Sequence, residues 1–404
     1  MQAVSIIILT FIVTSMYISF LFLTLFFKNK KKLYKEPTSK DKPKLSAIIP
    51  AFNEHETIAR TIKAIKRTTY SNLIEILVMN DGSTDDTAKI AKQFSGVTVI
   101  TKEHSGKADS INQGLKIAKG EFIAVVDADS SPAKDAFSKM IPYFRNKKVG
   151  AVTSSLRSKN PENLLQKLQH IEYLMGSWGR KLLEYINGIY VTPGPLSMYR
   201  KKALLDIGGF DVRNVTEDLE VTWNLLKHKY KVKMCLSAKT YTTTHKKLGD
   251  WWNQRIRWNV GALQTMYKYR GTVFRKSSGI LGFFVAPFLI VFNIVSLLGF
   301  LTLIYLTWKN VFSYFLYLRN ASAAQINLFN FELSFLPNIF SLFMTFLMLL
   351  SILYVYLGLS TLKENNKKET PFFAYVVYVL GYLTMFPAVT IHSIFRLVTN
   401  KYQW

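Results

Sequence analysis

Long runs of uncharged residues lie on both sides of a mixed central region. Residues 1–27 contain no charged side chain, and three further uncharged runs cover 280–308, 333–362 and 371–395. A helix needs about 20 apolar residues to cross the hydrocarbon core of a bilayer. The pattern therefore predicts four transmembrane helices, with one domain of residues 44–250 between the first and the second.

The charges beside these runs set the expected orientation. Residues 28–43 form a basic linker that begins "KNKKK", and the lysine-rich stretch "KENNKKET" separates the last two runs. The loop 309–332 holds only two basic residues. Because basic loops stay in the cytoplasm, we expect a plasma-membrane protein with both termini outside and the central domain inside.

The central region alternates short apolar runs with stretches of helical spacing. "LSAIIPAF", "IEILVMND" and "EFIAVVDAD" have the pattern of buried strands, and "ETIARTIKAIKRT" and "STDDTAKIAKQF" that of helices. Near-continuous apolar strands separated by helices are typical of a doubly wound, mostly parallel α/β sheet. Such sheets bind ligands at the carboxyl ends of their strands. Glu54, Asp81, Asp127 and Asp129 all fall at such ends.

Composition and charge narrow the functional classes. The 404 residues carry a formal charge of +26, which favours an anionic partner, although the basic flanks of the spans explain it equally well. The basic residues are scattered and form no aromatic-interleaved stripe, which argues against nucleic-acid binding. The uncharged runs lack Asp, Glu, Lys and Arg, which counts against an ion-coupled transporter. The single cysteine, Cys235, excludes an intramolecular disulfide.

The stretch "VDADS" predicts a divalent-metal site. Asp127 and Asp129 flank one residue, so in an extended segment their carboxylates point to the same side. Carboxylate oxygens suit Mg²⁺ or Mn²⁺, which bridge to phosphates. Neither a GxGxxG nor a GxxxxGK[ST] fingerprint is present in the chain, so a nucleotide has to be held by other means.

Two later stretches each allow a structural and a functional interpretation. In "TEDLEVTW", the structural interpretation is that Thr216 caps a helix with Glu217 and Asp218 in its first turn. The functional interpretation is that Asp218 is a catalytic carboxylate. In "DWWNQRIRW", which opens the segment 251–278, the tryptophans suit a helix at the membrane interface. We expect that helix also to close the site.

The motifs together resemble a known family. "PAFNE", "NDGSTDDT", "GKADSIN", "VDADS", "TPGPLSMYRK", "GGFD", "TED" and "QRIRW" occur in the order seen in processive, membrane-embedded family 2 glycosyltransferases. That family includes cellulose, hyaluronan and poly-N-acetylglucosamine synthases, and the resemblance covers Lys44 to Trp258. It implies a GT-A type domain that transfers sugar from a UDP-sugar, with inversion, to a growing β-linked polysaccharide extruded through the spans.

Other functions remain open beside this one. The alternative is a non-processive transferase that adds one sugar to a lipid or another carrier. A non-enzymatic membrane scaffold is a third class, and the complete set of acids argues against it. With only four spans, the resemblance implies that a second copy or a small accessory subunit helps to form a pore.

The resemblance implies a donor-binding role for six residues. Lys107 would lie near the nucleotide, and Asp81 would contact the uracil near Ala51 and Glu54. Asp127 and Asp129 would hold the nucleotide and its divalent metal, Mg²⁺ or Mn²⁺.

Five more residues would act on the acceptor and the leaving group. Asp218 would be the general base, with Glu217 in support. Gln254, Arg257 and Trp258 would form the QxxRW cluster, with Arg257 on the diphosphate and Trp258 under the acceptor sugar.

Residues 164–185 predict one long amphipathic helix, because apolar side chains recur every three or four positions. Such a helix either packs on the sheet or lies on the membrane beside a polymer channel. We favour the second arrangement, because Lys167, Arg180 and Lys181 flank the apolar face.

Overall fold

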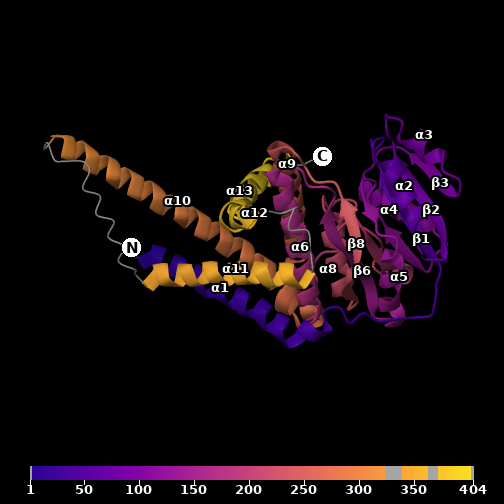
Figure 1. Ribbon diagram of the computed structural model, residues 1–404, viewed down its shortest axis with the longest axis horizontal. Coiled ribbons are helices and arrows are strands. Elements are labelled where there is room, and N and C mark those ends of the chain that lie inside the picture. Colours follow the sequence, from indigo (N-terminus) through magenta and orange to yellow (C-terminus); the bar gives the residue numbers. More distant parts are fainter. Residues whose placement is uncertain (1, 324–338, 363–371, 402–404) are drawn as a thin grey trace.

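The computed structural model describes residues 2–323, 339–362 and 372–401 (Figure 1). The start of the third predicted span, the lysine-rich loop after it and Pro371 lie outside the described residues.

One eight-stranded sheet forms the centre of the soluble domain, in the order β3-β2-β1-β4-β7-β6-β8-β5. The strands are β1 (Leu45–Ala51), β2 (Leu73–Asp81), β3 (Val97–Lys102), β4 (Phe122–Val125), β5 (Ser131–Pro132), β6 (Val149–Ser158), β7 (Ser197–Arg200) and β8 (Lys231–Thr242). The first four strands are parallel, as the sequence predicts. The second half is mixed, because β7 runs antiparallel to both β4 and β6.

Short helices cover the sheet. They are α2 (Ile58–Lys66), α3 (Thr87–Lys92), α4 (Lys107–Ile117), α5 (Ala136–Met140), α7 (Lys201–Asp206) and α8 (Glu217–Lys227). In α2, Ile58, Ile62 and Ile65 share one helix face and are fully buried, whereas Lys63 and Lys66 are exposed. This spacing of apolar positions fixes which side of the helix packs on the sheet.

Helix α6 (Leu164–Glu184) joins the sheet to the apolar helices. It begins with a capping box, in which the Asn163 side chain accepts from the Gln166 amide and Gln166 bonds back to the Asn163 backbone. One side packs on β6 and β8, and the other packs on α1 and α11. The packing of α6 on the sheet, which was the first arrangement, is therefore present, and the position of α6 beside a polymer channel stays a prediction.

Four apolar segments are long enough to cross a membrane: Val4–Lys32, Leu281–Asn320, Thr345–Leu362 and Phe373–Val398. The corresponding helices are α1 (Gln2–Asn29), α10 (Ala286–Ala323), α11 (Ile339–Leu362), α12 (Phe372–Val377) and α13 (Met385–Val398). The helix α10 continues well past Trp308, where the uncharged run ends.

The four segments are not arranged alike (Figure 1). Helices α1, α10 and α11 project away from the sheet, and α1 contacts both of the others. Helices α12 and α13 lie between these helices and the sheet, where α13 packs on α9 (Leu248–Lys268). The Asn259 amide donates to Thr390 Oγ1 at 3.0 Å, and the Trp252 indole to His392 Nδ1 at 3.1 Å.

Candidate active site

A cavity of about 720 Å³ opens where β1, β2 and the segment after β4 end, under α6 and α9. Every site residue predicted from the sequence lines it: Ala51, Glu54, Asp81, Lys107, Asp127, Asp129, Glu217, Asp218, Gln254, Arg257 and Trp258. They come from six separate stretches of the chain, so the fold brings into one cavity residues that lie far apart in the sequence.

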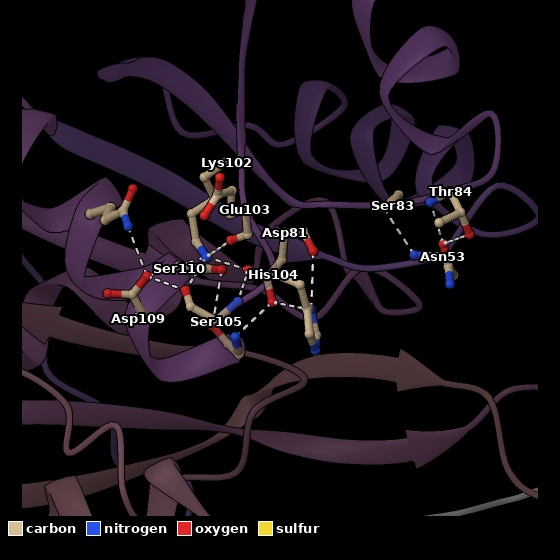
Figure 2. A network of polar contacts seen from close by, with 12 residues as sticks. Asn53, Asp81, Ser83, Thr84, Lys102, Glu103, His104, Ser105, Asp109 and Ser110 are labelled. Carbon is tan, nitrogen blue, oxygen red and sulfur yellow. Dashed lines mark hydrogen bonds and ion pairs between the residues drawn. The ribbon is translucent and has the colours of Figure 1, made fainter.

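Asp81, the last residue of β2, anchors one end of the cavity (Figure 2). Its carboxylate accepts the backbone amides of Ser105 at 3.0 Å and Gly106 at 2.8 Å, and it forms an ion pair with Lys102. Burial alone would raise the pKa of Asp81, but these donors lower it overall. The carboxylate is therefore a fixed negative group.

His104 and Phe52 are cavity residues that the motifs did not indicate. Their rings stack with centroids 4.2 Å apart, and His104 Nδ1 lies 3.0 Å from Asp81 Oδ2. A flat apolar surface beside a carboxylate suits a nucleobase, because the ring faces can stack and the acid can accept a hydrogen bond. The only signal in the sequence is that both rings follow predicted strands within a few residues.

The loop after β1 is hydrogen-bonded to the loop after β2 (Figure 2). Asn53 has a positive φ of 53°. Its side-chain oxygen accepts a hydrogen bond from the backbone amide of Thr84 at 2.9 Å, and its backbone amide donates to Ser83 Oγ at 3.0 Å. Asparagine tolerates this left-handed conformation better than most residues. These bonds position Glu54, whose pKa is raised chiefly by burial.

The two aspartates of "VDADS" meet at the cavity as the sequence predicts. Asp129 accepts only weak bonds from the hydroxyls of Thr242 and Thr243, each at 3.3 Å, together with one from Ser130 at 3.0 Å. Among the residues that the structure describes, no group of three or more His, Cys, Asp and Glu side chains is placed to hold a metal ion. The donor set therefore fits an ion that takes its remaining ligands from phosphate and water, as Mg²⁺ does.

Lys107 forms ion pairs with one aspartate of "VDADS" and with one acid of "TED". Its ammonium lies 2.6 Å from Asp127 Oδ1 and 2.7 Å from Glu217 Oε1. Burial opposes the charge of Lys107, but the two carboxylates raise its pKa overall. Gly194, in the "TPGP" loop, lies so close that a Cβ atom would sit 2.6 Å from both the ammonium and Asp127. Only glycine fits there without displacing the pair.

Asp218 is a buried carboxyl group of the cavity whose pKa is raised into the neutral range. Burial, followed by the adjacent Glu217 carboxylate, raises its pKa to about 7. Its Oδ1 accepts only the neighbouring Leu219 amide, at 2.8 Å. Thr216 makes no side-chain cap bond to α8 and instead donates to Asn214 at 3.2 Å. The capping interpretation of "TED" therefore fails for Thr216, and Asp218 keeps an oxygen free to accept a proton.

The two arginines of "QRIRW" have different surroundings. Arg257 lines the cavity with Gln254 and Trp258, and its charge lowers the pKa of both Glu217 and Asp218. Arg255 is 1% exposed and pairs with Glu172 Oε2 of α6 at 2.5 Å, while its guanidinium lies 4.0 Å from the centre of the Trp258 ring. Arg255 therefore packs against the Trp258 ring and holds it in position.

Helix α6 adds a third set of cavity residues that the motifs missed. Glu172, Gly176 and Arg180 line the cavity, together with Tyr173. The signal was present in the sequence as polar or small residues recurring every four positions, since such positions share one face of a helix. It was hidden because the helix is otherwise apolar.

Comparisons with known proteins agree with this geometry. Residues 46–208 match the family described as glycosyl transferase family 2. The chain is 32% identical over 231 residues to the poly-β-1,6-N-acetyl-D-glucosamine synthase of Staphylococcus aureus (strain COL), covering 55% of this chain and 56% of that protein. It is 33% identical over 230 residues to the synthase of the same name from Staphylococcus epidermidis. The chain spans about half the length of these curated relatives.

A solved structure resembles nearly the whole chain. The mannosyltransferase PcManGT from Pyrobaculum calidifontis, solved with GDP-Man and Mn2+, superposes with a TM-score of 0.62 at 18% identity, over 97% of this chain and 99% of that one. The likeness supports the fold, soluble and apolar helices included. Residues 46–208 of this chain therefore match glycosyl transferase family 2, and the domain that holds them has the GT-A fold.

Proposed function

We propose that this protein transfers a sugar from a UDP-sugar to a growing β-linked polysaccharide at the cytoplasmic face of the membrane. The observation that carries the proposal is the single cavity that holds the Asp127–Asp129 pair, the perturbed Asp218 and the unpaired Arg257 side by side. The curated relatives support a polymer of N-acetylglucosamine as the product class.

In this mechanism Asp218 takes the proton from the acceptor hydroxyl. The acceptor oxygen then forms a bond to the anomeric carbon of the donor sugar, on the face opposite the leaving diphosphate, and the bond from that carbon to the diphosphate breaks. Arg257 stabilises the charge that the diphosphate gains, because its planar guanidinium pairs with phosphate oxygens. Attack from the opposite face inverts the anomeric configuration.

Asp127 and Asp129 are the residues that would hold a divalent ion together with the donor phosphates. When bound, Mg²⁺ or Mn²⁺ would neutralise charge on the leaving group. We expect Asp129→Asn to weaken UDP binding in the presence of Mn²⁺ at least tenfold while leaving metal-free binding unchanged, as measured by titration calorimetry. Equal UDP affinity in both proteins with Mn²⁺ would contradict the metal assignment.

Trp258 suits the acceptor side, because it is 36% exposed at the cavity and offers a flat apolar face to a sugar ring. Extrusion of the product through the chain's own apolar helices is part of the same proposal. Transfer of one sugar to a lipid or another carrier is the second candidate, and it is favoured by the contact of α6, which lines the cavity, with α1 and α11.

The deciding experiment uses the full chain in lipid nanodiscs with Mn²⁺ or Mg²⁺ and a panel of radiolabelled UDP-sugars, followed by sizing of the products. Long polymer from one donor supports polysaccharide synthesis and identifies the sugar. Lipid carrying a single sugar supports the second candidate. No metal-dependent turnover of any donor would contradict glycosyl transfer from UDP-sugars.

A further inference from the structure

Arg180 is a buried cation in the cavity that has no carboxylate partner. The residue is only 9% exposed, yet it lines the cavity. Its one hydrogen bond to a side chain goes to Ser177 Oγ at 3.3 Å, and its Nε atom is buried without any partner. Among the residues that the structure describes, no Asp or Glu forms an ion pair with it.

The other buried cations around it are neutralised. Lys107 has two carboxylate partners, Arg255 has Glu172, and Lys181 has Glu184 at 3.1 Å. An unpaired buried charge costs several kcal/mol. Burial lowers the pKa of Arg180 to about 10, so the group stays charged at neutral pH. The fold therefore holds a desolvated positive charge that an incoming anion would compensate.

Gly176 lies one turn before Arg180 on α6, and both residues line the cavity. A Cβ atom at Gly176 would make only a van der Waals contact with the Arg180 guanidinium, at 3.4 Å. The glycine therefore adds no side chain between the cavity and the charge.

Arg180 lies on the side of the cavity that faces the apolar helices. A Cβ atom on the adjacent Gly179 would lie 3.3 Å from the Tyr354 hydroxyl of α11 and 3.9 Å from the Phe22 ring of α1. The Asp218 carboxylate is near enough to act on the pKa of Arg180. Arg180 is thus near the proposed base, on the cavity helix that packs on the apolar helices α1 and α11.

From these contacts we propose that Arg180 binds a phosphate group of the acceptor, and that the acceptor which enters the empty site is a membrane lipid phosphate. The inference rests on the proposed function, because it names the acceptor of the same transfer. In this transfer an oxygen of the lipid phosphate forms the bond to the anomeric carbon of the donor sugar, while the bond from that carbon to the diphosphate breaks and UDP leaves. Asp218 then acts as the base for hydroxyl acceptors in any later additions. A guanidinium suits this role, since it pairs with two phosphate oxygens at once.

The test measures binding of dodecyl phosphate and of UDP to the full chain in nanodiscs of neutral lipid. Arg180→Gln is expected to weaken dodecyl phosphate binding about tenfold or more, because a charge-assisted bond is lost. UDP binding should change less than about twofold, and Arg180→Lys should retain part of the phosphate affinity. Arg213→Gln, which removes an exposed arginine outside the cavity, should match the wild type in both assays.

Several outcomes would overturn the inference. Equal loss of UDP and dodecyl phosphate binding would assign Arg180 to the donor diphosphate. Unchanged discrimination between dodecyl phosphate and dodecanol would remove the phosphate subsite altogether. Competition by an acidic oligosaccharide, without competition by the lipid phosphate, would assign the charge to an anionic polymer.

The thermal midpoint separates binding from a purely structural role. Removal of an unpaired buried charge should leave the midpoint of Arg180→Gln equal to or above that of the wild type. A lower midpoint with unchanged phosphate binding would show that the residue only supports the fold. Binding of dodecyl phosphate that depends on Arg180, in a protein that turns over no UDP-sugar, would keep the subsite and reject the proposed function instead.

Discussion

At the scale of single residues, the site works through three carboxyl groups around Lys107. Asp127 and Glu217 both contact its ammonium, which lowers the pKa of Glu217 overall, whereas burial keeps the pKa of Asp127 raised. Asp218 makes no ion pair with Lys107 among the described residues. Two neighbouring carboxylates in different surroundings acquire different proton affinities. The burial of Asp218 therefore supplies a base near neutral pH, where a normal aspartate would be a weak one.

We expect Asp218→Asn to lower transfer by about 10²- to 10⁴-fold, because the amide cannot accept the proton. UDP binding should stay close to wild type, since Asp218 does not contact the nucleotide end of the cavity. Product formation and UDP titration measure the two effects separately. The exposed Asp86→Asn serves as the control, and near-normal turnover in Asp218→Asn would refute the base assignment.

The pH dependence follows from the raised pKa of Asp218. A base acts when it is deprotonated, so transfer should rise with pH and level off above about 7. Glu217→Gln removes a negative neighbour that raises this pKa, so the acidic limb of the profile should move to lower pH. The midpoint of the limb carries the information, whatever the height of the plateau. An unmoved limb would show that another group titrates.

The motif residues could be predicted from the sequence because each has a fixed place after a strand or at a helix start. Asp81, Asp127 and Asp129 follow buried apolar strands, and parallel strands deliver their ends to one edge of a sheet. His104 and Arg180 could not be found in that way. Their local signals, a place soon after a strand for His104 and a four-residue repeat for Arg180, are weak, because the surroundings depend on which distant segments cover them.

At the scale of elements, a buried ion pair holds helix α9 in place on the side that faces away from the cavity. Arg255 of α9, Glu172 of α6 and the Tyr382 hydroxyl of η6 (Tyr378–Tyr382) meet at one point, with both partners bonded to the same Glu172 oxygen at 2.5 Å. The other side of α9 carries Gln254, Arg257 and Trp258 into the cavity. The same helix α9 is therefore bonded to Tyr382 of an apolar segment, through Glu172, and lines the cavity.

We expect Glu172→Gln to destabilise the protein by about 3 kcal/mol, because Arg255 is left as a buried unpaired charge. The thermal midpoint in nanodiscs should fall, and transfer should fall with it. Glu172→Gln combined with Arg255→Gln should cost less than the two single changes together. Lys246→Gln, which breaks an exposed pair with Glu162, should leave the midpoint unchanged. Strictly additive losses would contradict the coupling.

The elements themselves were largely predictable, and their partners were not. The apolar repeat in the sequence indicated the long helix at 164–185. The two packed sides of this helix have the same residue types, so the sequence did not show which side packs on the sheet and which on the apolar helices. The antiparallel β7 was missed for a related reason. Its four residues, Ser197–Arg200, are too few and too mixed in polarity to show a strand pattern, and strand direction is set by the path of the loop before it.

At the scale of the whole molecule, the last apolar segment decides the topology. Its length and composition allow a fourth crossing, which would place Lys401 outside. Its contacts point elsewhere, because both of its ends contact helices of the soluble domain. Helix α12 packs on α6, and residues 390–393 of α13 hydrogen-bond to Trp252, Ile256 and Asn259 of α9, which lines the cavity. Both ends of the segment therefore lie at the level of the soluble domain.

We therefore expect Lys401→Cys, in a Cys235→Ser background, to be protected from an impermeant maleimide in intact cells. Gln93→Cys on the soluble domain should be protected as well, and Gln2→Cys should be labelled, because α1 crosses the membrane. Labelling of all three after permeabilisation is the control for reactivity. Labelling of Lys401→Cys in intact cells would establish four crossings and return the C-terminal end to the outside.

The packing of Trp178 also has a consequence in time. Its ring contacts Tyr354 of α11 with centroids 4.6 Å apart, and Phe26 of α1 at 5.5 Å. Ribosomes add about 5–20 residues per second, so the tyrosine is synthesised roughly 10 to 35 s after the tryptophan. During that interval the outer face of α6 has only α1 to cover it. During synthesis, α1 would thus cover the outer face of α6 first, and in the folded protein it shares that face with α11.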